Sequence, residues 1–263
     1  MKKITKLMII SASVLLFAGI FIFALGMTRI GWDFTKLSTE KYETNTYEIR
    51  GDVTHIIIKA TAADILFVPS NTDKCMVSCH ETITERHSIS MENGVLAIEA
   101  VNTKKWYDYI GIMAFDSPKI TLYLPKDYYT LVKINLSAGD ISLSNLKIHS
   151  LSLSTKTGDT NLSNITCNGL ASIGSTGDIT LNNVVANTIF SIQRSTGDIT
   201  LNACDGDDIS LNTTTGDIKG TILSEKNFRA KATTGSVSVP DTNTGGNCTI
   251  HATTGDIKIK IAE

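Results

Sequence analysis

The chain has 263 residues, with 24 Lys and Arg, 26 Asp and Glu, and a formal net charge of −2. This near-neutral balance argues against a nucleic-acid-binding protein that works through general attraction to phosphates. A hydrophobic content of 42% excludes a wholly disordered chain, and 19 Gly against 4 Pro indicate β structure with many tight turns.

The N-terminal residues predict a membrane anchor. Three lysines within residues 1–6 precede a charge-free run at 7–27, whose length matches the ~20 residues that cross a bilayer as a helix. A secretory signal peptide has a shorter apolar region and a cleavage site of small residues, so we favour an uncleaved signal anchor over a cleaved signal. The lysines, against Arg29 and Lys36 after the span, indicate a cytoplasmic N-terminus and an extracellular C-terminal domain in the cell membrane.

Residues 28–46 have mixed composition and no hydrophobic period, and we expect them to form a linker. We expect 47–263 to be one β-repeat domain, regular over 130–263 and with larger excursions before that. In the earlier part, Asn93-Gly94 lies between two runs of alternating hydrophobic residues, which is typical of a two-residue β-hairpin turn.

An aromatic and apolar cluster lies between residues 102 and 117, in a chain otherwise poor in aromatic residues. If exposed, this cluster is a candidate site for a partner or for stacking on a glycan. If buried, it caps the stack of repeats or packs on a sheet. The candidate partner-binding residues are Trp106, Tyr107, Tyr109 and Phe115.

A short phrase, close to Thr-Gly-Asp-Ile, recurs every 19–20 residues. Its glycines are Gly139, Gly158, Gly177, Gly197, Gly216, Gly235 and Gly255. A degenerate copy at Ala63-Asp64 stands four periods of 19 residues before the first of them. Within each unit the apolar residues alternate with a period of two, which predicts strands with one buried face.

One such unit cannot bury its apolar edge alone, but stacked units form continuous aliphatic columns. We therefore predict an all-β fold, a β-solenoid of the parallel β-helix kind, preceded by one transmembrane helix. A stack of antiparallel hairpins is the alternative, because Gly-Asp also suits tight turns. At the far end, Lys258 and Lys260 are expected to point outward and protect an exposed terminal edge.

A single N-terminal span, the sequence Leu-Pro-Lys-Asp at 124–127 and the serial Thr-Gly-Asp-Ile phrases resemble the bacterial adhesin-like domain called the toast-rack domain. The resemblance covers about residues 47–263. It implies a bacterial, envelope-facing β-repeat protein, in a group also associated with envelope-stress systems. It brings no catalytic residues with it.

One repeat position holds Asp in all but one unit, where Ser236 replaces it. In a stack, these carboxylates would lie near one another, so each must be hydrogen-bonded, screened or bridged. The structural interpretation is that each Asp accepts backbone N–H groups in its own turn, and the alternative is a Ca²⁺ ion that bridges carboxylates. The candidate ligands are Asp140, Asp159, Asp178, Asp198, Asp217 and Asp256.

The five cysteines are interpreted mainly as small buried hydrophobic residues. Cys204 falls in the apolar column of Leu146, Ile165, Val184 and Leu223, and Cys167 and Cys248 fall in similar columns. Cys75 and Cys79 would share a strand face but lie too far apart to bond without a bend. The chain has no C-x-x-C sequence and no His cluster, which argues against a structural zinc site.

The leading functional hypothesis is a membrane-anchored, non-enzymatic protein that presents a binding surface to cell-envelope polymers or surface proteins. The threonines that precede six of the repeat glycines are expected to hydrogen-bond along the stack or to contact sugars; they are Thr157, Thr176, Thr196, Thr215, Thr234 and Thr254. An accessory regulator of a membrane envelope-stress sensor is the alternative. An envelope polysaccharide enzyme is the third hypothesis, although the scattered histidines and repeat-locked carboxylates do not suggest a catalytic pair.

Overall fold

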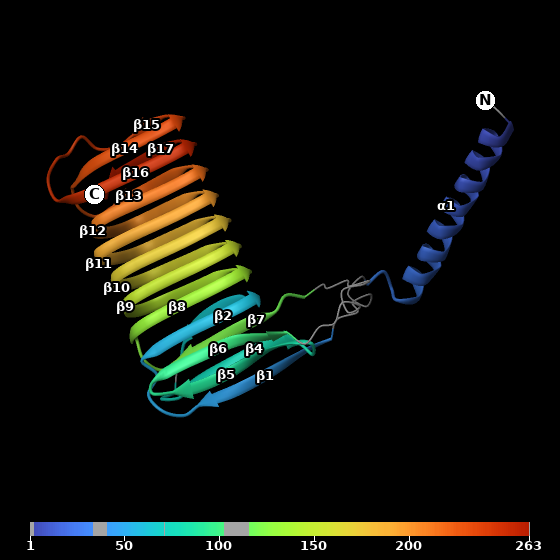
Figure 1. Cartoon of the computed structure of the whole chain (residues 1–263), viewed down its shortest axis with the longest axis horizontal. Coiled ribbons are helices and arrows are strands. Elements are labelled where there is room, and N and C mark those ends of the chain that lie inside the picture. The colour runs from blue at the N-terminus through green and yellow to red at the C-terminus, as the bar shows by residue number, and fades with distance from the viewer. Residues whose placement is uncertain (1–2, 34–40, 71, 103–115, 263) are drawn as a thin grey trace. The chain divides into compact units, whose positions relative to one another are not determined.

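The computed structural model describes residues 3–33, 41–70, 72–102 and 116–262. The chain divides into two units. Helix α1 (Lys3–Arg29) belongs to one, and all the strands belong to the other (Figure 1). Each unit is described by itself.

Helix α1 is long and apolar enough to cross a membrane. Its 27 residues extend about 40 Å at 1.5 Å per residue, more than the ~30 Å of a hydrocarbon core. The hydroxyls of Ser11 and Ser13 donate to carbonyls one turn earlier, Leu7 O and Ile9 O, at 2.9 Å, so both polar groups are satisfied within the helix. One N-terminal apolar helix therefore fits a single-pass membrane anchor.

The second unit is built from strands alone, which stack in parallel over most of its length (Figure 1). The strands are β1 (Tyr42–Ile49), β2 (His55–Ala62), β3 (Asp64–Pro69), β4 (Cys75–Thr82), β5 (Glu85–Glu92), β6 (Val95–Asn102), β7 (Lys119–Leu124), β8 (Tyr128–Ala138), β9 (Ile141–Thr157), β10 (Thr160–Thr176), β11 (Ile179–Thr196), β12 (Ile199–Thr215), β13 (Ile218–Ile222), β14 (Lys226–Thr234), β15 (Val237–Ser238), β16 (Gly246–Thr254) and β17 (Ile257–Ile261).

The regular repeats form a parallel β-solenoid, as the sequence predicts. Strands β9, β10, β11 and β12 pair side by side in parallel, each residue opposite its equivalent in the next repeat. Leu143, for example, pairs with Leu162, which pairs with Leu181. The alternative of stacked antiparallel hairpins is therefore wrong for these repeats.

Each repeat bends where its pattern of burial changes phase. Along β9, buried and exposed side chains alternate, but the alternation slips at Asn145 and again at Ser150. Asn145 has a φ of 57°, in the left-handed region that permits a sharp bend and that Asn tolerates. Its equivalents Asn164 and Asn183 do the same, and their side-chain amides hydrogen-bond from repeat to repeat at 3.0 Å.

The interior consists of the predicted aliphatic columns, which are almost completely buried. Each buried Leu or Ile contributes roughly 1.5–3 kcal/mol relative to an exposed one. The column that contains Cys204 differs from the prediction at one position. Cys204 pairs with Ile222, because the register shifts after Leu201, so Ile222 is buried and Leu223 is exposed.

A buried cation interrupts the columns. Arg194 points inward, where its Nη2 donates to the hydroxyls of Thr160 and Ser172, both at 3.2 Å. Thr160 and Ser172 stand opposite Ile or Leu in both neighbouring repeats. Gly174 leaves the space that the guanidinium fills, since a Cβ there would lie 2.7 Å from Nη1. Burial lowers the pKa of Arg194 to about 10.

The irregular first part joins the same stack. Strand β2 pairs in parallel with β8, and β3 pairs in parallel with β7 and β9. The predicted hairpin is present, because β5 and β6 are antiparallel and their turn residues Asn93 and Gly94 both have positive φ, 49° and 80°. Strand β1 starts at Tyr42, inside the segment expected to be a linker, and pairs with β4.

The last repeats stack in an order that differs from their order in the chain. Strand β16 lies between β12 and β14, and β17 lies between β13 and β15. The final edge is therefore formed mainly by β14 and β15, and the expectation that Lys258 protects a terminal edge strand is wrong. Strand β15 pairs with β17 only at Ile257 and Lys258, so it does not cover β17 at Lys260. Each repeat offers nearly the same column of side chains to the repeat that stacks on it, so the periodicity does not specify the order in which the last repeats stack.

Candidate functional site

The repeated aspartates form a ladder between repeats. Oδ1 of each Asp accepts the backbone N–H of the equivalent residue in the next repeat, at 2.7–3.0 Å. The bonds therefore run to the next coil and not, as expected, within the same turn. In spatial order the ladder is Asp64, Asp140, Asp159, Asp178, Asp198, Asp217, Asp256 and Ser236.

The two ends of this ladder explain two sequence irregularities. Asp64, in the degenerate copy, supplies the first acceptor. Ser236, which breaks the column, stands last and donates both its N–H (2.7 Å) and its hydroxyl (2.9 Å) to Asp256. These two bonds hold the pKa of Asp256 below its usual range. In the described part of the chain, β15 pairs with β17 alone, so no next repeat requires a carboxylate acceptor at position 236.

The ladder also bears on calcium. One oxygen of each carboxylate already accepts a backbone N–H, which satisfies part of the charge without an ion. In the described part of the chain, the ladder residues do not form a group whose ligand atoms converge on one ion. A calcium site on Asp140, Asp159, Asp178, Asp198, Asp217 or Asp256 stays a prediction.

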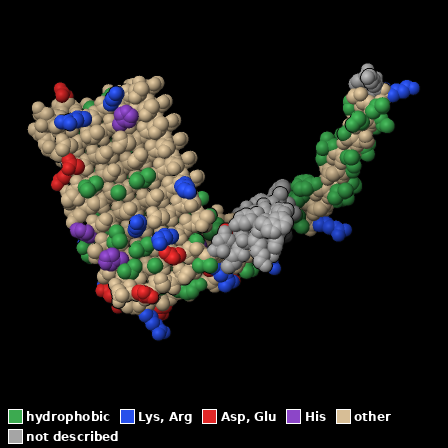
Figure 2. All heavy atoms as spheres, viewed as in Figure 1, with side chains coloured by type: hydrophobic (Ala, Val, Ile, Leu, Met, Phe, Trp, Pro, Cys, Tyr) green, Lys and Arg blue, Asp and Glu red, His purple; other side chains and the backbone are tan. Residues whose placement is uncertain are grey.

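A flat surface with few charges lies on the outward side of β8–β12. Its residues pair from strand to strand in three rows, and Figure 2 shows mainly neutral polar side chains and backbone over these strands. We call it the serine-rich face. Its rows are Leu131, Ser150, Gly169, Ile189, Asp208; then Lys133, Ser152, Ala171, Ser191, Ser210; then Asn135, Ser154, Ile173, Gln193, Asn212.

A groove hollows the serine-rich face at its β8 side. It has a volume of about 400 Å³ and runs over residues of β2, β6, β8 and β9. Ser154 and Asn135 line it together with two cations, Lys59 and Lys156. Lys59 pairs with Glu99 at 2.8 Å. Among the described residues, Lys156 forms no ion pair. The groove thus offers hydroxyl and amide groups and one cation, which suits an uncharged or weakly anionic polyol.

The serine-rich face was not predicted from the sequence. The threonines before each glycine, at 157, 176, 196, 215, 234 and 254, are exposed at a corner of the solenoid, and their backbone carbonyls accept N–H bonds from neighbouring glycines. The neutral Ser, Asn and Gln on alternate positions of the long strands were the missed signal.

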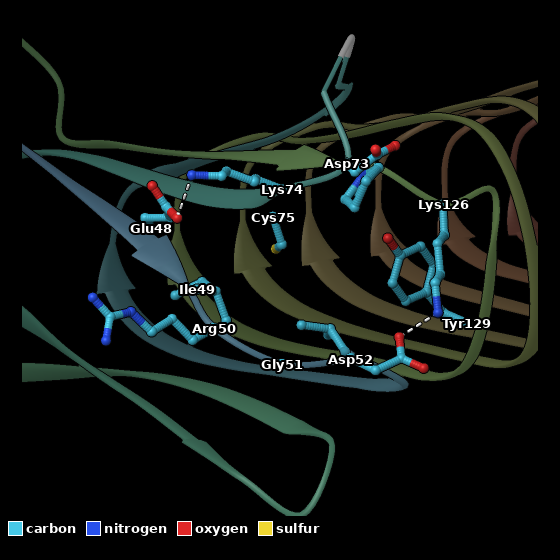
Figure 3. A pocket seen from close by; sticks show the side chains of 12 residues that line it. Glu48, Ile49, Arg50, Gly51, Asp52, Asp73, Lys74, Cys75, Lys126 and Tyr129 are labelled. Carbon is cyan, nitrogen blue, oxygen red and sulfur yellow. Dashed lines mark hydrogen bonds and ion pairs between the residues drawn. The ribbon is translucent and has the colours of Figure 1, made fainter.

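A second hollow lies at the β1 end of the stack (Figure 3). It encloses about 310 Å³. Its rim is charged but largely self-paired, because Lys74 bonds Glu48 at 2.7 Å and Lys126 bonds Asp52. The bond to Lys74 lowers the pKa of Glu48. Paired charges leave this pocket little net field to attract a charged ligand.

All five cysteines are buried and free, in agreement with their interpretation as small core residues. Cys75 and Cys79 lie on the inward face of the straight strand β4 and are not bonded to each other. Burial raises the thiol pKa to about 11 for Cys75 and about 12 for Cys79, Cys167 and Cys248. These thiols are therefore protonated at neutral pH.

The aromatic candidates Trp106, Tyr107, Tyr109 and Phe115 lie outside the described residues. Their role as a partner-binding site stays a prediction.

The sequence model of a family described as Toastrack DUF4097 matches residues 53–263. The chain belongs to this family. Among solved structures, a "putative adhesin" from Bacteroides fragilis is 17% identical, with a TM-score of 0.50 over 84% of this chain and 97% of its own. At this identity, the likeness supports the toast-rack fold alone.

Two other solved structures are similar to this toast-rack chain. A "putative cell adhesion protein" from Clostridium sporogenes is 13% identical over 85% of this chain and 100% of its own, with a TM-score of 0.42. A "Putative lipid binding protein" from Parabacteroides distasonis is 15% identical over 83% of this chain and 97% of its own, also with a TM-score of 0.42. No curated protein sequence is significantly similar to the chain.

Proposed function

We propose that this toast-rack protein is anchored by residues 7–27 with its N-terminus in the cytoplasm, and that its extracellular β-domain binds cell-envelope polymers without turning them over. The observation that carries the proposal is the serine-rich face. A rigid parallel sheet holds its side chains in three rows, and neighbouring rungs lie ~4.8 Å apart.

Three properties of this face suit a polymer of sugars. Its hydroxyl and amide groups both donate and accept hydrogen bonds. Its side chains are short, so little conformational entropy is lost when they bind. Ile173 and Ile189 add exposed apolar area between the polar groups, which can contact the apolar faces of sugar rings. Repetition along the stack lets one polymer chain make the same contacts several times, so weak single contacts add up.

The test is co-sedimentation of the full-length chain, in detergent, with purified bacterial cell wall. We expect saturable pelleting of the wild type. The pair Ser154→Glu and Ser191→Glu should weaken it at least tenfold, because bound polymer would have to cover two added charges. Matched controls are Asn161→Glu and Thr180→Glu, which lie at outward positions of β10 and β11 on a different side of the coil.

Three outcomes contradict parts of the proposal. Equal loss in both pairs places binding elsewhere on the domain. If the wild type does not pellet, cell-wall polymer is not the ligand. The partner would then be sought among membrane proteins, such as an envelope-stress sensor, by crosslinking of the full-length chain. Release of reducing ends from the wall makes the protein an enzyme.

A further inference from the structure

The inward face of β4 carries an acid inside the hydrophobic core. Cys75, Val77, Cys79 and Glu81 alternate along this strand and all point inward. Glu81 has 0% exposure, and so does Cys79. The chain then turns, and β5 brings His87, 8% exposed, against Glu81.

The three side chains converge. One ligand atom from each of Cys79, Glu81 and His87 lies within 4.8 Å of the other two. His87 Nδ1 lies 2.9 Å from Glu81 Oε2, and the backbone N–H of His87 donates to the same oxygen at 2.7 Å. The side-chain amide of Asn45, on β1, donates to Glu81 Oε1 at 3.0 Å. Among the described residues, this is the one such group of three.

A fully buried carboxylate is costly unless its charge is compensated. Within the described residues, no Lys or Arg forms an ion pair with Glu81. Arg86 pairs instead with Glu43, at 2.5 Å. Glu81 is left with an imidazole, an amide and a backbone N–H, and its neighbours on the inward face of β4 are Cys75, Val77 and Cys79. The arrangement is therefore more polar than packing requires.

We propose that Cys79, Glu81 and His87 bind one divalent transition-metal ion, of which Zn²⁺ fits best. A thiolate, an imidazole nitrogen and a carboxylate oxygen are the ligands that Zn²⁺ takes in proteins. The sulfur and nitrogen ligands disfavour Ca²⁺ and Mg²⁺, which prefer all-oxygen sites. The charge of the ion balances the thiolate and the carboxylate, and binding releases the thiol proton of Cys79 to solvent.

The surrounding residues support this assignment. Asn45 holds the second oxygen of Glu81 and so orients the carboxylate, as outer-shell partners of metal ligands do. A shallow surface depression lined by Thr61, Val101 and Pro118 also has His87 in its wall. The ion would also join β4 to β5, which do not pair with each other as strands.

The site escaped the sequence because its ligands do not follow a short-range motif. Cys79 and Glu81 are two residues apart in the sequence. On a strand this spacing places them next to each other on the same face, but it does not match the ligand spacings of metal sites on helices or loops. His87 reaches them only because the chain reverses between β4 and β5. The useful signal was a Glu at an inward position of a strand that otherwise alternates correctly.

Cobalt is the probe for the test, because a cysteine thiolate bound to Co²⁺ gives a ligand-to-metal charge-transfer absorption band. The full-length chain, in detergent with a metal-free reductant, is titrated with Co²⁺ and then with Zn²⁺. We expect one equivalent of Co²⁺ to produce the band and Zn²⁺ to remove it. Asn45→Ala should weaken binding by about 10–100-fold.

The matched control is Cys75→Ser, which changes a buried cysteine on the same face of the same strand. Cys79→Ser should abolish the band, and Cys75→Ser should keep it. Glu81→Gln, checked for folding by circular dichroism, should lower the affinity and keep the thiolate band at high Co²⁺. The proposal is overturned if the folded wild type gives no thiolate band, or if the band survives Cys79→Ser or is lost equally in Cys75→Ser.

Discussion

Substitution of a single repeat glycine tests how tightly the coils are stacked. Gly177 has a φ of 125°, where side chains are rarely tolerated, and an added Cβ would lie 2.2 Å from the carbonyl oxygen of Gly158 in the neighbouring coil. Backbone strain of this kind costs roughly 1–3 kcal/mol, and forcing the coils apart costs a further 1–3 kcal/mol or so. Gly177→Ala should therefore destabilise the domain by about 2–6 kcal/mol.

The control is Gly169→Ala in the same repeat. Gly169 has no positive φ, and nothing lies within 4 Å of an added Cβ. This substitution should be neutral or stabilise the fold by up to ~1 kcal/mol, through the lower entropy of the unfolded chain. Urea unfolding of both variants, followed by far-UV circular dichroism, measures the difference. If Gly177→Ala costs no more than Gly169→Ala, the close carbonyl contact between coils is refuted.

Three other predictions concern the core, pH and calcium. Ser172→Leu should destabilise the domain by about 1–3 kcal/mol. In the Arg194→Thr background it should destabilise the domain much less, because the guanidinium no longer fills the space beside residue 172. Equal destabilisation in both backgrounds, measured by urea unfolding in a double-mutant cycle, would contradict the contact between Arg194 and Ser172. Burial raises the pKa values of the thiols, so the thiols of the unfolded chain lose their protons first, and the stability of the fold should decrease as the pH rises from 9 towards 12. Cys167→Ala should make this decrease shallower in thermal unfolding at a series of pH values. An unchanged slope would contradict the raised pKa of Cys167. In the Cys79→Ser variant, which lacks one ligand of the proposed zinc site, addition of EDTA should leave the melting temperature unchanged if the Asp ladder is held by backbone N–H groups alone. A clear drop in the melting temperature of this variant would restore calcium to the ladder.

The regular half of the fold could be predicted because the residue types within each repeat indicate its local structure. Gly marks the corner, Asp marks the acceptor for the next coil, and alternation marks the buried face. The same regularity limited the prediction at the end of the chain. Units with equal columns can exchange places, so the position of β16 between β12 and β14 was not readable from spacing.

The missed sites depend on contacts that cross between repeats or depart from them. The ladder bonds link Asp residues a full repeat apart, and sequence reasoning assigned them to the local turn. Arg194 is accommodated by Thr160, Ser172 and Gly174, each of which departs from its column; together these departures were a signal of a buried polar group. His87 meets Glu81 only through the fold of the irregular part.

The most direct test of the functional account is hydroxyl-radical footprinting of the full-length chain with and without bound cell wall. Ile173 and Ile189, on the serine-rich face, are 56% and 59% exposed, and Leu223 and Val237, outside that face, are 44% and 43% exposed. All four should be oxidised in the free protein. The account predicts that bound wall protects Ile173 and Ile189 and leaves Leu223 and Val237 reactive. Protection of the second pair, with Ile173 and Ile189 still oxidised, would contradict the assignment of the serine-rich face as the binding surface.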